Sequence, residues 1–141
     1  MIRHRKSGQY RNIGLLLLRI GLGIMFILHG FPKVSGGPEV WVQYGEAAQF
    51  VGLNFAPMFF GFMAGITELF GGIFLILGLF FKPTVALLAV VMVVATAKHI
   101  ASGAPFSIMS HSIEIGIVCL SLLLIGPGKH SLDIRMKSRR W

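Results

Sequence analysis

The sequence predicts an all-α membrane protein in which four transmembrane helices form an antiparallel bundle. The 141-residue chain is 55% hydrophobic, and its mean hydropathy is +0.77. Only 13% of its residues are charged, about half the share typical of soluble domains. Four apolar runs each approach the roughly 20 residues needed to cross a bilayer. The length leaves room for one domain, so residues 1–141 are expected to form a single membrane domain.

The four predicted spans cover about residues 13–30, 57–81, 83–102 and 105–125. Pro57, Pro83 and Pro105 each suit a first helical turn, because the N–H group that proline lacks would have no partner there. Gly30 stands where the first helix is expected to end. Short connections join the last three spans, and such connections place consecutive helices antiparallel.

The first connection, residues 31–56, is long and contains a periodic segment. Apolar residues recur at helical spacing over residues 38–51, which predicts a short amphipathic helix. Trp41 and Tyr44 are residue types that favour the headgroup level of a membrane. This helix is expected either to lie on the membrane or to pack on the bundle.

Basic residues gather at the two ends of the chain. The sequence has 13 Lys+Arg against 5 Asp+Glu, concentrated in residues 1–12 and 127–141, with Lys82 in the tight turn after the second span. The positive-inside rule therefore predicts that both termini are cytoplasmic, in a multi-pass protein of the cell (inner or plasma) membrane. The tails are expected to contact anionic lipid, and no nucleic-acid partner is expected.

Cys119 is the single cysteine. It cannot form an intrachain disulfide or a thiol relay. Because it lies within an apolar run, it is expected to be a small buried residue.

Three ionisable residues, Arg19, Glu68 and Glu114, fall near the middle of predicted spans. Counted from the outer span ends, each lies about 13–17 Å deep. An unpaired charge there costs at least about 2.5–3.5 kcal/mol, so Arg19 is expected to pair with Glu68, Glu114 or both. These three are the candidate catalytic residues, since a pair of carboxylates in different environments suits proton-coupled chemistry. A network that only fixes helix register remains equally open.

A second polar layer is expected nearer the outer side. Its members are the candidate ligand-binding residues His29, Lys33, Lys98, His99 and His111. These side chains could donate hydrogen bonds or protons to a bound ligand. His29 and His111 could instead be ordinary interfacial histidines, or clamp a haem or a metal ion. No protein metal site and no intrinsic cofactor is expected, so electron transfer would need a partner subunit.

Three longer motifs cover most of the chain: "LLRIGLGIMFILHGFPK" followed by "GG", then "GITELFGGIFLILGLFFKPTVALLAVVMVVA", and finally "GPGKHSLD". In this combination, from about Asn12 to Asp133, the chain resembles the DoxX family of small four-span membrane proteins. The positions that match the family pattern are Arg19, His29, Gly30, Lys33, Glu68, Gly71 and Gly72.

The DoxX resemblance implies a four-helix membrane bundle with a role around membrane redox chemistry, such as a small subunit of a thiosulfate:quinone oxidoreductase or of an oxidative-stress complex. The bundle also looks like that of vitamin K epoxide reductases, but the cysteines that work there are absent here.

Three functions are consistent with these observations. The first is a quinone-linked redox or oxidative-stress subunit, with a buried ionisable network open toward the outer half of the bundle. The second is a non-enzymatic assembly or stabilising subunit of a membrane complex. The third is a small proton-coupled transporter, which with four spans would have to act as an oligomer. The expected partners are the lipid bilayer, a second copy or a redox subunit, and, for the first function, a bound quinone.

Overall fold

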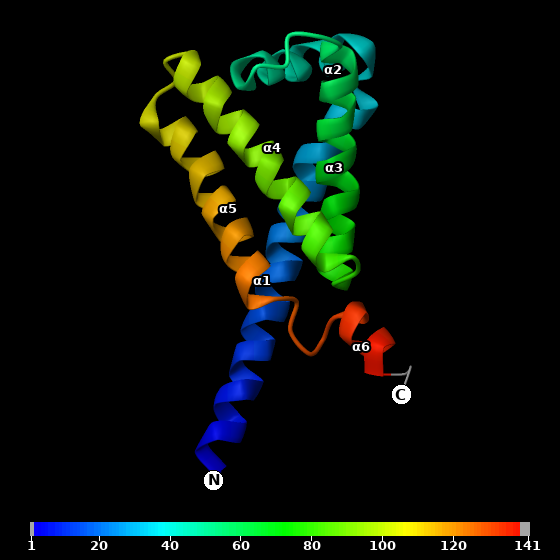
Figure 1. The fold of residues 1–141 in the computed structure, drawn as a ribbon, viewed down its shortest axis with the longest axis vertical. Helices are drawn as coiled ribbons and strands as arrows, with labels where there is room; N and C mark the ends of the chain where they lie inside the picture. Colours follow the sequence, from blue (N-terminus) through cyan, green and yellow to red (C-terminus); the bar gives the residue numbers. More distant parts are fainter. Residues whose placement is uncertain (1, 139–141) are drawn as a thin grey trace.

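The computed structural model describes the backbone of residues 2–138 and the side chains of residues 8–138 (Figure 1). Its elements are α1 (Ile2–Ser35), α2 (Gly37–Gly45), the 3₁₀ helix η1 (Glu46–Val51), α3 (Pro57–Leu77), α4 (Phe81–Ala101), α5 (Phe106–Ile125) and α6 (Leu132–Ser138). Four of them, α1 from Gly8 onward and α3, α4 and α5, are long and apolar enough to cross a membrane. The predicted fold class is confirmed. The ends of the predicted basic tails, residues 1–7 and 139–141, lie outside the described side chains.

The first helix is longer than the sequence predicts. α1 does not end at Gly30 but continues through Pro32 to Ser35. Gly30 is instead a packing position, because a Cβ atom there would collide with the backbone of α3 at Leu69. Lys33 consequently lies on the helix rather than in a loop beyond it.

Small residues allow α1 and α3 to approach closely along their length. A Cβ atom added to Gly23 would lie 2.6 Å from the carbonyl oxygen of Gly72, and one added to Gly72 would lie 2.5 Å from the carbonyl oxygen of Gly23. Such backbone contact is how glycine promotes helix association in membranes. These two helices share the most extensive contact of the described fold.

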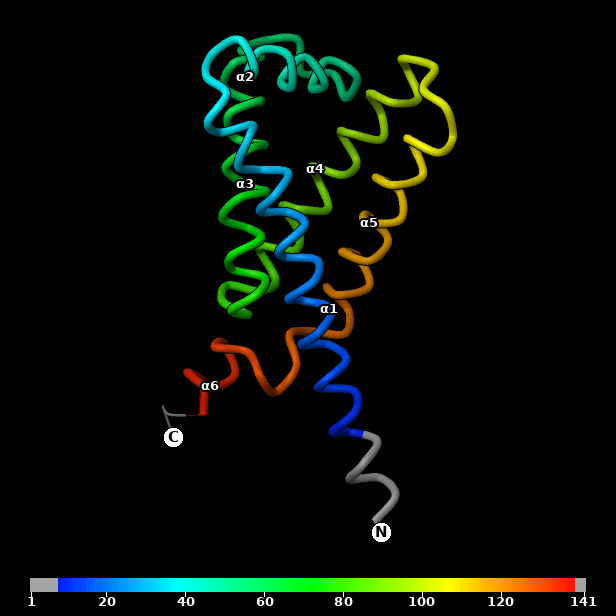
Figure 2. The backbone as a smooth tube through the Cα atoms, turned by 180° about the vertical axis from the view of Figure 1, so that it is seen from behind, coloured from blue at the N-terminus to red at the C-terminus, as the bar shows by residue number. Residues whose placement is uncertain are grey.

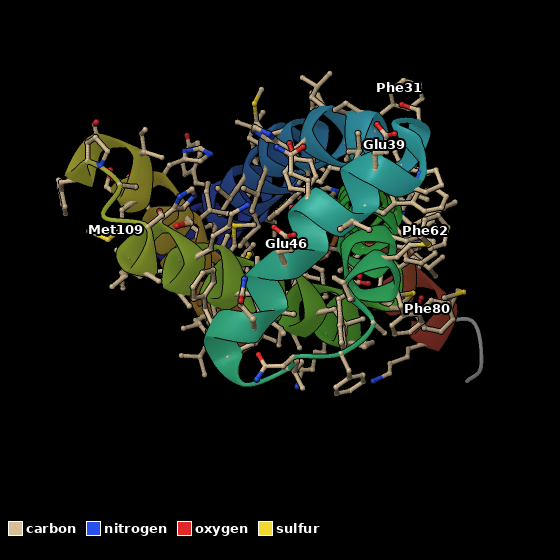
Figure 3. All side chains as sticks on the ribbon, turned by 90° about the horizontal axis from the view of Figure 1, so that it is seen from above. Phe31, Glu39, Glu46, Phe62, Phe80 and Met109 are labelled. Carbon is tan, nitrogen blue, oxygen red and sulfur yellow. The ribbon has the colours of Figure 1, made fainter. Side chains whose placement is uncertain are left out.

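The periodic segment of the first connection folds over one end of the bundle. Figure 3 shows α2 and η1 lying across the tops of the long helices. α2 packs against the start of α3, where Gly45 meets Pro57 and Gly61 meets Trp41. The indole N–H of Trp41 donates to the carbonyl of Lys33 at 2.9 Å. We call this covered end the α2 end and the opposite end, beside α6, the α6 end.

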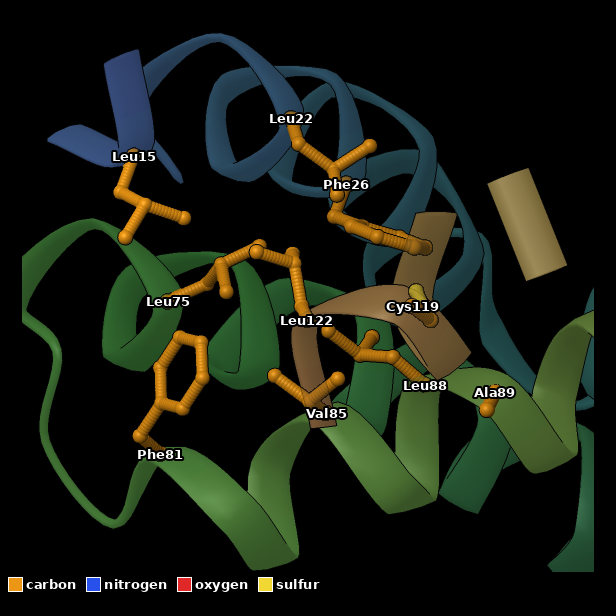
Figure 4. Packing of buried hydrophobic residues seen from close by; sticks show 10 residues of the cluster. All are labelled: Leu15, Leu22, Phe26, Leu75, Phe81, Val85, Leu88, Ala89, Cys119 and Leu122. Carbon is orange, nitrogen blue, oxygen red and sulfur yellow. The ribbon is translucent and has the colours of Figure 1, made fainter. Parts of the chain in front are cut away.

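The long helices spread apart toward the α2 end. In Figures 1 and 2, α4 and α5 run side by side and diverge from α1 and α3 in that direction. The hydrophobic core, whose packing Figure 4 shows from close by, lies toward the α6 end. Its members are Leu15, Leu22, Phe26, Leu75, Phe81, Val85, Leu88, Ala89, Cys119 and Leu122. Cys119 is fully buried, as predicted. The described chain is therefore a wedge, packed at one end and open at the other.

Asp133 holds α6 against the turn between α3 and α4. Its carboxylate accepts the N–H groups of Phe80 and Phe81, at 3.0 and 2.8 Å. Its own N–H donates to the carbonyl of Gly78 at 3.1 Å. The N–H groups at the start of a helix have no partner within the helix, so Asp133 supplies the cap that α4 lacks locally.

Candidate functional site

A divided chamber occupies the α2 end, between the α1–α3 pair and the α4–α5 pair. It consists of a compartment of about 220 Å³ and a second of about 460 Å³. Lys33, Glu68, Ala95 and His99 line both compartments. The two spaces therefore meet at these four residues, from α1, α3 and α4.

A buried ion pair stands where the compartments meet. The Nζ atom of Lys33 lies 2.7 Å from Oε1 and 2.6 Å from Oε2 of Glu68. The Lys33 side chain is 16% exposed and that of Glu68 is 3% exposed. A pair removed from water to this degree is stable only while both partners are present.

Arg19 does not belong to this site, and its predicted pairing with Glu68 or Glu114 is wrong. Its guanidinium donates at 2.9 Å to the carbonyl of Leu75, at 2.7 Å to that of Ile76 and at 2.8 Å to that of Pro127. These carbonyls belong to the last turn of α3 and to the loop before α6.

The predicted partners of Arg19 are wrong because α1 is longer than the sequence suggested. Because the helix runs to Ser35, Arg19 lies farther from the α2 end than a count from Gly30 implied. There it meets the C-terminus of antiparallel α3, where a cation is favourable to the helix dipole. Arg19 thus caps α3, and Lys33 takes the place that Arg19 was expected to hold beside Glu68.

Glu114 also lies outside the chamber. It is exposed on α5 and lines neither compartment. The predicted layer of one cation and two carboxylates is therefore not assembled by this chain. Of the three candidate catalytic residues, only Glu68 lines the chamber.

The smaller space, which we call the histidine compartment, is bounded by α1, α3, α4 and α5. Its lining residues are Leu22, Met25, Phe26, His29, Lys33, Glu68, Met92, Ala95, His99, Ile108, His111, Ser112 and Ile115. The ring centroids of His29 and His111 are 6.0 Å apart. The structure thus brings together four of the five candidate ligand-binding residues around one largely apolar space.

The larger space, which we call the aliphatic compartment, lies between α3 and α4 beneath η1. Its lining residues are Lys33, Tyr44, Ala47, Ala48, Leu53, Phe59, Phe60, Met63, Ala64, Thr67, Glu68, Leu87, Val90, Val91, Val94, Ala95, Lys98 and His99. Lys98, the fifth candidate, lies here. The sequence did not indicate Tyr44 as a site residue, because its role depends on α2 folding back over the bundle.

Tyr44 lies between two ammonium groups. Its ring centroid is 4.8 Å from Nζ of Lys33 and 5.8 Å from Nζ of Lys98. Both distances are within the range of cation–π attraction. Lys98 also approaches the carbonyl of Gln43 at 3.5 Å.

Among residues 8–138, no three His, Cys, Asp or Glu side chains are grouped so that they could hold a metal ion. The chemistry that the described chamber offers is hydrogen-bond donation, proton exchange and apolar contact.

Comparisons with known proteins agree with this architecture. The DoxX family model matches residues 14–101, which include His29, Lys33 and Glu68. Inner membrane protein YphA of Escherichia coli (strain K12) is 30% identical over 146 aligned residues, which cover 95% of this chain and 98% of that protein. Inner membrane protein YqjF of the same organism is 27% identical over 134, covering 92% and 96%. No solved structure matches the chain significantly. The chain is an integral membrane protein that belongs to the DoxX family.

Proposed function

We propose that this protein binds a lipid-soluble quinone in the histidine compartment and acts as the quinone-binding subunit of a membrane redox system. The observation that supports this most is the compartment itself, in which apolar walls surround a few converging polar groups beside a buried ion pair. Pockets of this composition are the usual sites for apolar ligands with polar ends.

A quinone has the chemistry that this compartment complements. Its ring and tail are apolar, and its two carbonyl oxygens accept hydrogen bonds. Lys33 would donate to one carbonyl, and His29 and His111, which line the compartment from α1 and α5, would donate to another. Methionine and leucine side chains would contact the ring.

The protons needed for quinone reduction would be delivered by the histidines. A quinone takes up two electrons and two protons to become a quinol. Histidine is the side chain that most often transfers protons to and from reacting groups. The electrons would come from a partner subunit, so the role proposed for this chain is to bind the quinone and deliver protons.

We also propose that the α6 end faces the cytoplasm of an inner or plasma membrane. Described basic residues at or beyond that end are Arg11, Lys82, Lys129, Arg135 and Lys137. Cytoplasmic loops of membrane proteins carry an excess of Lys and Arg. The chamber would then lie in the outer half of the bilayer, as the sequence suggested.

The test is to purify the protein in mild detergent and to identify bound quinone in the organic extract by mass spectrometry. We expect quinone with the wild type and at least a tenfold loss with Glu68→Gln, because that change leaves Lys33 without its partner. Glu39→Gln, the same change at an exposed position on α2, should retain quinone. An absence of quinone from the wild type after reconstitution with added quinone would contradict the proposal.

One observation favours the second function, an assembly subunit. Glu114 is exposed on α5. In the apolar stretch of that helix that is long enough to cross a membrane, only 17% is buried within the described chain. A carboxylate in lipid is costly, so a partner helix on this face would stabilise it. If Glu114→Leu dissociates an oligomer or a larger complex during size exclusion with light scattering, while quinone is absent, the assembly function is favoured.

A further inference from the structure

We propose that the aliphatic compartment is a second binding site, separate from the quinone site, for an anionic single-chain amphiphile such as a fatty acid. In this proposal the carboxylate head lies at Lys98, and the acyl chain runs along α4 between α3 and the η1 roof. Three features of the compartment lead to this ligand class: its charge, its lining and the side on which it opens.

The charge of the lining favours an anion. Two ammonium groups, Lys33 and Lys98, border the compartment, and Glu68 is the only carboxylate among its lining residues. Glu68 is engaged by Lys33 at 2.6 Å. Lys98 is half-buried, and its ammonium faces the Tyr44 ring at 5.8 Å and the Gln43 carbonyl at 3.5 Å in an exposed contact. Neither of these two groups carries a negative charge. An anionic head would supply a counter-charge for the ammonium group of Lys98.

The rest of the lining is suited to a hydrocarbon chain. On α4 it extends from Lys98 back to Leu87 by way of Val90, Val91 and Val94, a length of about 16 Å. Aromatic and aliphatic side chains of α3 form the facing wall. A polar group at one end of a long apolar trough matches a molecule with one head and one tail.

The compartment is roofed at the α2 end and bordered on its side by exposed apolar residues. Tyr44, Ala47, Ala48 and Leu53, from α2, η1 and the following loop, form its roof. Its lining residues Phe59 and Met63 on α3 and Leu87 and Val90 on α4 are exposed on the sides of predicted spans. In a bilayer these side chains meet lipid tails, so a ligand would enter between α3 and α4 from the membrane.

The experiment measures binding to the purified, reconstituted full-length protein with oleate as the probe. Oleyl alcohol, which has the same chain and a neutral head, serves as the comparison ligand. We expect saturable binding of one oleate per chain and at least tenfold weaker binding of the alcohol. Lys98→Gln should weaken oleate binding at least tenfold, while Lys82→Gln, on the α6-end turn, should leave it unchanged. Equal affinity for acid and alcohol, or unchanged binding by Lys98→Gln, would overturn the proposal.

A second pair of variants tests the route without altering charge. Val90 and Val93 are 58% and 60% exposed on α4, but only Val90 lines the compartment. Val90→Trp should obstruct the opening and slow oleate association at least fivefold, whereas Val93→Trp should not. Equal effects of the two changes would contradict lateral entry. Competition by phosphatidylglycerol as strong as by oleate would contradict a single-chain ligand.

The same samples separate this site from the quinone site. Lys98 lies outside the histidine compartment, so Lys98→Gln should retain co-purifying quinone while losing oleate affinity. Oleate binding in a protein that never binds quinone would refute the proposed function and leave the second site standing.

Discussion

Arg19 illustrates how a charge inside an apolar helix can serve the backbone rather than a ligand. It is 1% exposed and donates to the carbonyls of Leu75, Ile76 and Pro127. These three bonds join α1, α3 and the loop that leads to α6. A single side chain therefore fixes three segments far apart in the sequence.

Replacing Arg19 should destabilise the fold even when the positive charge is kept. Arg19→Lys keeps the cation but cannot reach three carbonyls at once, because lysine lacks the planar fork of donors. We expect a loss of about 2–4 kcal/mol, from buried acceptors left without partners. Unfolding in mixed micelles, followed by circular dichroism, measures this. Arg11→Gln, at an exposed position of the same helix, is the control, and equal losses for both variants would refute the capping role.

The Lys33–Glu68 pair should behave as a unit. Lys33→Met or Glu68→Gln alone leaves one buried charge uncompensated, with an expected cost of about 3 kcal/mol. The double variant should lose less unfolding free energy than the sum of the two single losses. The difference should be about 1 kcal/mol or more, as is typical of residues in contact. A double-mutant cycle of unfolding free energies tests this coupling. Strict additivity would mean that the two side chains do not interact in the membrane.

Residue chemistry was easier to predict than residue partners. The sequence indicated that Arg19, Glu68 and Glu114 would face the interior, since charges on the lipid face are costly. Arg19 and Glu68 are buried, whereas Glu114 is exposed. Which of them meet depends on where each helix ends, and that depends on tertiary contacts. Gly30 suggested a stop, but packing of Gly30 on Leu69 and the hydrogen bond from Trp41 to the Lys33 carbonyl stabilise the extra turn.

At the scale of the elements, the pairing of α1 with α3 depends on glycine. A Cβ atom at Gly30 would meet the backbone of Glu68 and Leu69, whereas one at Gly21 would meet nothing within 4 Å. Because the two glycines are on the same helix, comparing alanine substitutions at the two positions separates the effect of packing from the effect of helix propensity.

Gly30→Ala should therefore destabilise the protein by about 1–3 kcal/mol, because the helices must move apart. Gly21→Ala should be neutral or stabilising by up to about 1 kcal/mol, since alanine favours helix more than glycine does. Unfolding free energies of the two variants provide the measurement. Opposite signs are the expected result, and a similar effect of both changes would contradict the close contact.

Hydropathy predicted the existence and order of the long helices well, because about 20 apolar residues leave few alternatives. It predicted the small elements less well. The segment 38–51 forms two pieces, α2 and η1, and it lies on α3 through Gly45 and Gly61. Nothing in its periodicity specified that surface, because packing on the bundle and lying on the membrane both bury one apolar face.

At the scale of the whole molecule, the wedge shape creates the site. The core gathers toward the α6 end, while the chamber lies at the α2 end, covered by α2 and η1. The sequence could not predict this shape, because all four spans are similarly apolar. Glu114 is exposed on α5 and lies outside this chamber.

The central claim is that an apolar ligand with hydrogen-bond acceptors occupies the histidine compartment. Photolabelling of the reconstituted protein with an azidoquinone, followed by mass mapping, tests it most directly. We predict labels within residues 22–33, 92–99 and 108–115, whose side chains line that compartment, and their loss when excess unlabelled quinone competes. Labels spread over the outer surfaces of the spans, unaffected by competition, would contradict the claim.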